Sequence, residues 1–304
     1  MPQAARQQAL RAYHFECVCP RCWEDLDVYE VCRTSPLLTL NSFSLSPDIE
    51  KLRAPPVDKT LFLQITSEQV QNIYTSWHRL TIEQAGGVME RSKMRWELCQ
   101  PLIEAKMWAV EPVPSSLLEM AVMFQSASSN FVSAVSLACF VATECTPFKL
   151  VAPFNAFRIK GVLLISKLLS QTAEFLSQLG TTGPDGTVGL PRNCPQGLVD
   201  VLRRSDQVSM CEALVRLVVH YAPMASSRDW EVFQTAAEML EDIEKLEGRE
   251  NESSLLKAWA SNPNQGEGEA FFKEQVLKPI HEVAAFAIDI VNSEFGDSGI
   301  IIRR

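Results

Sequence analysis

Apolar residues recur at helical spacing over most of the chain after about residue 63. Four of them lie three or four residues apart in the segment 67–84, namely Val70, Ile73, Trp77 and Leu80. This spacing places all four on one face of an α-helix, so the segment is predicted to be an amphipathic helix. The pair Gly86-Gly87 interrupts the pattern and is expected to end the helix.

The same pattern continues to about residue 295, and only the tail Ile300-Ile301-Ile302 resembles a strand. A second helix is expected to carry Met94, Leu98, Ile103 and Met107, with Pro101 as a kink or a boundary. Ser115-Ser116 are expected to cap a third helix, and Ser128-Ser129-Asn130 a fourth that is rich in small residues. Further helices are expected near 156–179, 196–202, 206–222, 229–246, 253–259 and 270–295.

The predicted fold class is mainly α. Consecutive helices with short breaks form antiparallel hairpins, and stacked hairpins form a TPR-like array or a bundle. No clean 34-residue repeat is visible, so the TPR-like arrangement is an expectation about architecture. The expected domains are a cysteine loop over 1–23, an irregular connector over 24–62, and a helical domain over 63–304.

Composition and charge argue against some classes of function. A net charge of −9 argues against direct binding to nucleic acid or to anionic membranes, which requires clustered Lys and Arg. No apolar stretch approaches the roughly 20 residues of a membrane span. Nine cysteines, an odd number, with Cys139 and Cys211 in apolar helical patterns, indicate reduced core thiols. We therefore expect an intracellular protein of the nucleus, the cytoplasm or both.

Three cysteines lie within six residues near the start of the chain, in the run Cys17-Val18-Cys19-Pro20-Arg21-Cys22. Thiols this close together can bind one zinc ion, but a structural zinc site needs four protein ligands. Cys32 is a candidate for the fourth ligand, and His14 is a weaker one. The alternative is three unrelated thiols or a transient redox pair.

The run Arg11-Ala12-Tyr13-His14-Phe15-Glu16, continued by this cysteine motif, resembles the post-SET element of SET-domain lysine methyltransferases, most closely the SET-and-MYND (SMYD) type. Residues 147–161 also resemble a helix opening of fungal SET proteins. In that family a helical, TPR-like domain follows the post-SET loop. The resemblance implies that Cys17, Cys19 and Cys22 bind zinc, that Phe15 stacks on the adenine of S-adenosylmethionine, and that Tyr13 lines the channel for the substrate lysine.

The chain departs from the family in lacking the SET core, including the N-H-S-C motif that supplies the fourth zinc ligand. The resemblance therefore implies the C-terminal portion of such an enzyme, with zinc as a cofactor, S-adenosylmethionine only if a SET core is present, and a protein partner or Lys-containing substrate. This portion is not expected to be catalytic alone, and whether the protein is an enzyme stays open. The alternative is a stand-alone helical interaction scaffold with a zinc knuckle.

Other motifs favour structural roles. The sequence Ser254-Leu255-Leu256-Lys257 matches S-x-x-K without its companion motifs, so Ser253-Ser254 are expected to cap a helix. Cys211 and His220 are not expected to form a catalytic dyad. The acidic residues between 238 and 247 are expected to form a solvated helix face paired with Lys245 and Arg249.

Overall fold

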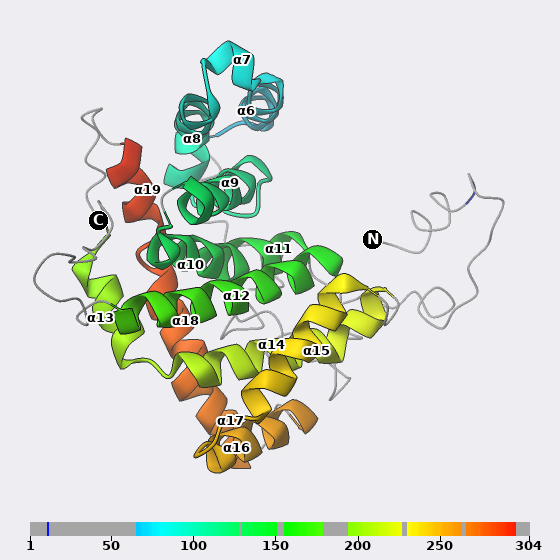
Figure 1. The fold of residues 1–304 in the computed structure, drawn as a ribbon. Helices are drawn as coiled ribbons and strands as arrows, with labels where there is room; N and C mark the ends of the chain where they lie inside the picture. The colour runs from blue at the N-terminus through cyan, green and yellow to red at the C-terminus, as the bar shows by residue number, and fades with distance from the viewer. Residues whose placement is uncertain are drawn as a thin grey trace, which may run out of the picture.

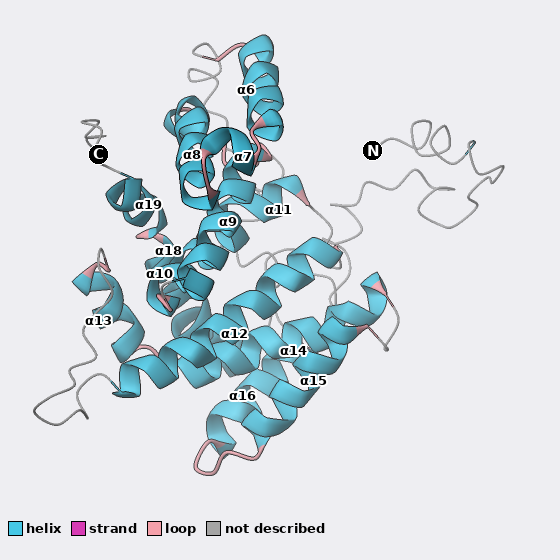
Figure 2. Ribbon diagram, turned by 45° about the horizontal axis from the view of Figure 1, so that its top comes forward, coloured by secondary structure: helices cyan, strands magenta, loops and turns pink. Residues whose placement is uncertain are grey.

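The computed structural model describes Arg11 and residues 65–127, 129–150, 155–178, 194–226, 230–262 and 266–295. Every regular element within these ranges is a helix (Figure 2), so the predicted mainly α class is confirmed, while the TPR-like arrangement stays a prediction. The predicted cysteine loop and connector lie outside the described residues.

The first helices form one end of the molecule (Figure 1): α6 (Ser67–Arg79), α7 (Ile82–Ala85), α8 (Val88–Glu104) and α9 (Pro112–Ala127). A capping box starts α6, in which the Gln69 amide N–H donates to Thr66 Oγ1 at 3.2 Å and the Thr66 amide N–H donates to Gln69 Oε1 at 2.7 Å. These two bonds satisfy donors that the first helical turn cannot pair internally. Helix α8 continues through Pro101, which is therefore not a boundary.

The middle of the molecule is built around α10 (Phe131–Phe140). All its residues from Val132 to Phe140 are buried, because α9, α12 (Ala156–Gln178) and the C-terminal helices pack on different sides of it. The small side chains of α10, such as Ala134 and Ala138, permit this close approach, as the sequence predicts. Its N-cap is Asn130, whose Oδ1 accepts from the Ser133 amide N–H at 3.1 Å.

The remaining helices are α13 (Gln196–Arg204), α14 (Gln207–Ala225), α15 (Glu231–Glu244), α16 (Glu250–Ser261), α17 (Gly266–Phe272), α18 (Lys278–Ala284) and α19 (Ala287–Phe295). Helix α14 packs between α12 and α15, while α18 and α19 return to α10 (Figure 1). Ser136 Oγ of α10 donates to the Val283 carbonyl of α18 at 2.7 Å. Trp96 Nε1 of α8 donates to Asn292 Oδ1 of α19 at 3.2 Å, so the C-terminal helices contact α8 as well.

Two short π-helices interrupt the α-helical pattern, each just before a proline. The first, η1 (Val141–Cys145), leads into α11 (Thr146–Lys149) and Pro147; the second, η2 (Lys273–Leu277), leads into α18 and Pro279. A proline lacks the N–H for the regular helical bond and crowds the carbonyl four residues earlier. A widened turn relieves this conflict without ending the helix.

Several predicted boundaries are wrong. Ser115 and Ser116 lie inside α9, which begins at Pro112, and the Ser116 hydroxyl accepts from Trp77 Nε1 at 2.8 Å. Ser253 lies inside α16 and does not cap it, because Glu250 starts that helix. The single helix expected over 270–295 is divided into α17, η2, α18 and α19. Of the five tryptophans after residue 63, Trp77, Trp96 and Trp259 are buried in the core, and Trp108 and Trp230 are half-buried against it.

Candidate functional site

The residues that the sequence marks for chemistry lie outside the described part of the chain. They are Tyr13, Phe15, Cys17, Cys19, Cys22 and Cys32. Among the described residues, no group of three or more His, Cys, Asp or Glu side chains is placed to hold a metal ion. The zinc site therefore stays a prediction, and the described helices offer cavities instead.

A cavity of about 590 Å³ lies between α9, α10 with η1, and α12, and we call it the α9–α12 groove. Its lining consists of Glu111, Pro114, Ser115, Leu118, Ala138, Val141, Ala142, Thr146, Leu150, Phe157, Lys160, Gly161 and Leu164. This volume falls within the usual range for sites that bind a partner side chain or a small molecule, and most of the lining is apolar.

The groove exists because two helices share a neighbour but scarcely contact each other. Helices α9 and α12 both pack along α10, on either side of it, whereas contacts between α9 and α12 are few. They meet at Gln125 and Gln171, where Gln125 Nε2 donates to Gln171 Oε1 at 3.2 Å. The groove is lined by the first half of each helix, and the glutamine pair lies about two turns beyond the last lining residue of each. We call the end at the exposed Phe157 the open end of the groove.

Small residues form the floor and allow the groove its depth. Ala138 and Ala142 come from α10 and η1, and Gly161 comes from α12. A Cβ atom added at Gly161 would meet no atom within 4 Å, so the glycine faces open space. The π-helix η1 supplies Val141 and Ala142 to this floor, and π-turns inside helices are frequent at functional sites.

The open end of the groove carries an exposed aromatic ring and two opposite charges. Phe157 is 71 % exposed, the largest exposed fraction among the large apolar residues that the structure describes. Lys160 lies one turn further along α12, and its ammonium group lies 5.9 Å from the Trp230 ring centroid. On the α9 side, Glu111 Oε1 lies 3.9 Å from His78 Nε2.

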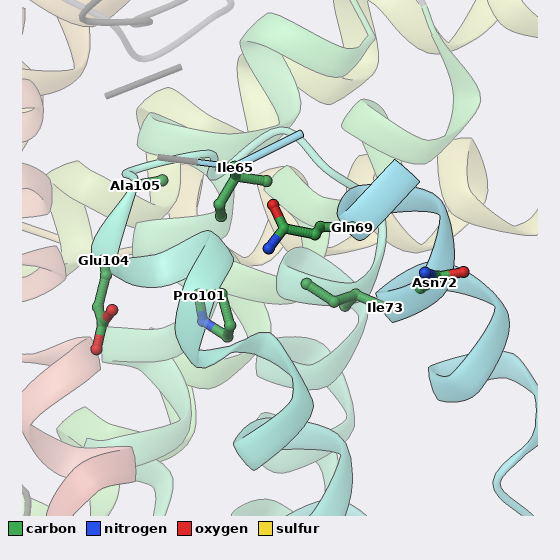
Figure 3. A pocket seen from close by; sticks show the side chains of 7 residues that line it. All are labelled: Ile65, Gln69, Asn72, Ile73, Pro101, Glu104 and Ala105. Atoms are coloured by element: carbon green, nitrogen blue, oxygen red, sulfur yellow. The ribbon is translucent and has the colours of Figure 1, made fainter. Parts of the chain in front are cut away.

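A second cavity, of about 360 Å³, lies between α6 and α8 (Figure 3). Gln69 and Ile73 of α6 reach toward Pro101 of α8, whereas Glu104 points away from it (Figure 3). The Gln69 side chain is already used in the capping box of α6. Since its polar groups do not converge, this cavity offers no arrangement for binding or chemistry comparable with the α9–α12 groove.

A third candidate is a cluster of charges at the junction of α14, α15 and α16, which we call the Glu212 cluster. It consists of Asp206, Ser209, Glu212, Arg216, Glu244, Arg249, Ser253 and Lys257. The Glu212 side chain is fully buried. Its Oε1 accepts from Arg216 Nε at 3.1 Å and from Ser253 Oγ at 2.7 Å, and its Oε2 accepts from an Arg249 guanidinium nitrogen at 3.2 Å.

The Glu212 cluster balances its own charges. Three carboxylates face three cations, and Glu244 binds both Arg216 at 2.8 Å and Lys257 at 3.1 Å. These bonds, led by the one from Arg216, lower the pKa of Glu244. Sequence patterning assigned Arg249 to the acidic face of α15 and missed its bond to Glu212. The available signal was Glu212 with Arg216 four residues later, on an otherwise apolar helix.

Burial disfavours the reactive thiolate form at four of the five described cysteines. Burial raises the pKa of Cys99 and that of Cys211 to about 12, and the pKa of Cys194 to about 11. Reactive cysteines require the opposite shift. The Cys211 thiol donates to the Ser166 carbonyl at 3.4 Å. His220 packs edge-on against the Tyr221 ring, so the pattern offers no support for a Cys211–His220 dyad.

Comparison with known proteins gives no relative: no family model, no curated protein and no solved structure matches this chain. None of the described helices is long and apolar enough to cross a membrane. The residues themselves therefore carry the functional argument.

Proposed function

We propose that this chain is the C-terminal portion of a SET-domain lysine methyltransferase-like protein, in which a TPR-like helical domain binds a protein partner or a Lys-containing substrate. In this proposal the chain supplies a post-SET lid and a binding surface, and it does not methylate on its own. The observation that carries the binding role is the α9–α12 groove with the exposed Phe157 at its mouth.

The order of segments supports the methyltransferase part of the proposal. The motif of Cys17, Cys19 and Cys22 precedes the helical domain, as a post-SET loop precedes the helical domain in SET-and-MYND proteins. Three thiols would bind zinc as thiolates, with the fourth ligand from Cys32 or from outside this chain. S-adenosylmethionine would bind only with a SET core present, with Phe15 against its adenine and Tyr13 beside the substrate lysine.

The metal content of the purified full chain tests the cysteine motif. We expect about one zinc per chain by elemental mass spectrometry after dialysis, and loss of that zinc when Cys17, Cys19 and Cys22 are all replaced by serine. The matched single variant Cys32→Ser keeps the zinc if the fourth ligand lies elsewhere and loses it if Cys32 completes the site. A triple variant that retains all its zinc would contradict the post-SET assignment.

The alternative is a stand-alone helical interaction scaffold with a zinc knuckle. It is favoured by the described helices, which bury a continuous apolar core of their own from Ile65 to Phe295. An antibody raised against the helical domain separates the two proposals on immunoblots of native cells. A band well above 34.0 kDa supports an attached catalytic half, whereas a single band near 34.0 kDa supports the scaffold.

A further inference from the structure

We propose that the α9–α12 groove binds an amphipathic helix of a protein partner, with an acidic residue of that helix placed at Lys160. This inference rests on the proposed partner-binding function and names the chemistry of the partner. Its occupant is one helix, held by an apolar stripe between α9 and α12 and oriented by charge at the open end.

The proposed helix would pack between α9 and α12. Packed helices lie about 8–10 Å apart, and small residues at the contact allow the shorter distances. Helices α9 and α12 each pack on α10 without filling the space between them, and the floor there consists of Ala138, Ala142 and Gly161. An added helix would lie over this floor and contact Leu118 on one side and Leu164 on the other.

Burial of exposed apolar residues beside the groove would favour binding of such a helix. Val122, one turn after the lining residue Leu118 on α9, is 54 % exposed, and Phe157 on α12 is 71 % exposed, so both helices that border the groove carry exposed apolar residues. A helix with apolar residues at i, i+3, i+4 and i+7 would pack against both helices, which is a recurrent mode of peptide recognition.

The charge at the mouth selects an acidic partner on the α12 side. Within the described part of the chain, no carboxylate pairs with Lys160, whose described contact is with the Trp230 ring. Lys160 lies in the second turn of α12, and the first turn of that helix holds no acidic residue, so the positive end of the helix adds to the lysine charge. Glu111 lies on the opposite rim and would repel an acidic residue, so the acidic residue of the partner helix is expected to lie against α12 and not against α9.

Synthetic peptides test the proposal with the full chain. Three peptides of about 14 residues, near four helical turns, serve as probes. The first has an apolar stripe flanked by Glu, the second has the same stripe flanked by Lys, and the third has the composition of the Glu peptide in scrambled order. Fluorescence anisotropy reports binding. We expect the Glu peptide to bind, the Lys peptide to bind about fivefold more weakly, and the scrambled peptide to give no signal.

Three variants locate the binding. Lys160→Glu is expected to reverse the preference between the Glu and Lys peptides, and Lys167→Glu, an exposed change two turns along α12, is its matched control and should leave the preference unchanged. Gly161→Leu fills the groove from a position with open space and should abolish binding of both peptides. Circular dichroism checks that each variant is folded.

The inference would be overturned if neither the Glu nor the Lys peptide binds, if the two bind equally, or if Gly161→Leu leaves binding unchanged. Failure here is distinguishable from failure of the proposed function, because the zinc content and the native mass do not depend on the groove. A protein that holds zinc through Cys17, Cys19 and Cys22 but binds no peptide retains the methyltransferase-like assignment and loses this partner.

Discussion

Two junctions of three helices are built in opposite ways. At α9, α10 and α12 the residues that line the junction are mostly apolar, with small ones along α10, and the helices leave an open groove. At α14, α15 and α16 the meeting residues are charged, and the Glu212 cluster fills the space with hydrogen bonds. The first junction leaves apolar surface in contact with solvent, whereas the second satisfies its buried carboxylate within the chain.

The two junctions differ in what they leave for a partner to bury or to pair. A buried carboxylate is tolerated only when its charge and hydrogen-bonding capacity are met, and Glu212 meets them with two arginines and a serine. Both oxygens of Glu212 are therefore already paired within the chain. In the groove, burial of exposed Phe157 and pairing of Lys160 are both still available to a partner. The Glu212 cluster therefore has a structural role, and the proposed recognition rests on the groove alone.

Removal of Glu212 should break the closed junction and give the largest effect. The variant Glu212→Ala leaves Arg216 and Arg249 without their buried partner, and we expect the free energy of unfolding to fall by about 3–5 kcal/mol in urea titrations. The matched control is Glu241→Ala, which removes an exposed partner of Lys245 on α15 and should leave stability unchanged. A loss below about 1 kcal/mol for Glu212→Ala would mean that the cluster relaxes or admits water.

Glycine substitutions compare packing near the two junctions. Gly268 of α17 lies against α16, and a Cβ atom there would approach the Leu255 carbonyl oxygen to 2.7 Å and the Trp259 amide nitrogen to 2.8 Å. Both atoms are backbone, so α17 would have to move and disturb the stack of Trp259 on Phe272, whose ring centroids are 3.9 Å apart. We expect Gly268→Ala to cost about 1–3 kcal/mol by urea unfolding.

The corresponding change in the groove should have the opposite sign. Gly161 lies inside α12 with open space around its missing Cβ, so Gly161→Ala improves helix propensity without a clash. We expect a gain of about 0.5–1 kcal/mol in the same urea titration. A loss of stability would show that the floor of the groove is already filled in solution and would weaken the comparison.

The helical class and many helix positions could be predicted from apolar spacing, because a helix that buries one face must repeat about every 3.6 residues. The same reasoning failed at helix ends. Ser115-Ser116 and Ser253-Ser254 are good cap residues, but Pro112 already starts α9 and Glu250 already starts α16. Local preference was overruled there by partners distant in sequence, since Ser116 accepts from Trp77 and Ser253 donates to Glu212.

The groove could not be predicted from the sequence at all. It depends on α9 and α12 failing to pack on each other, which is a property of three helices and not of any one apolar pattern. Arg249 was likewise assigned to its neighbours on α15 because the chain gives no local sign of Glu212, 37 positions earlier. The candidate zinc ligands show the reverse case: spacing alone suggests Cys17, Cys19 and Cys22, and they lie outside the described residues.

The smallest expected effect concerns the exposed edge of the closed junction. Hydrogen bonds from Arg216 and then Lys257 lower the pKa of Glu244 below its ordinary value of 4.5. A carboxylate with a lowered pKa stabilises the fold fully above its unfolded pKa, and this contribution is lost as the pH falls through the folded pKa. The Glu244→Gln variant should therefore be less stable than the parent chain at pH 7, by about 0.5 kcal/mol or less because the side chain is 38 % exposed and screened.

Urea titrations at pH 7 and below pH 4.5 measure this difference in stability between the variant and the parent chain. The difference should close at the lower pH, and added salt should narrow it at pH 7. A gap that stays constant with pH would mean that Glu244 stabilises the junction through packing, and the contrast with the groove would then rest on Glu212 alone.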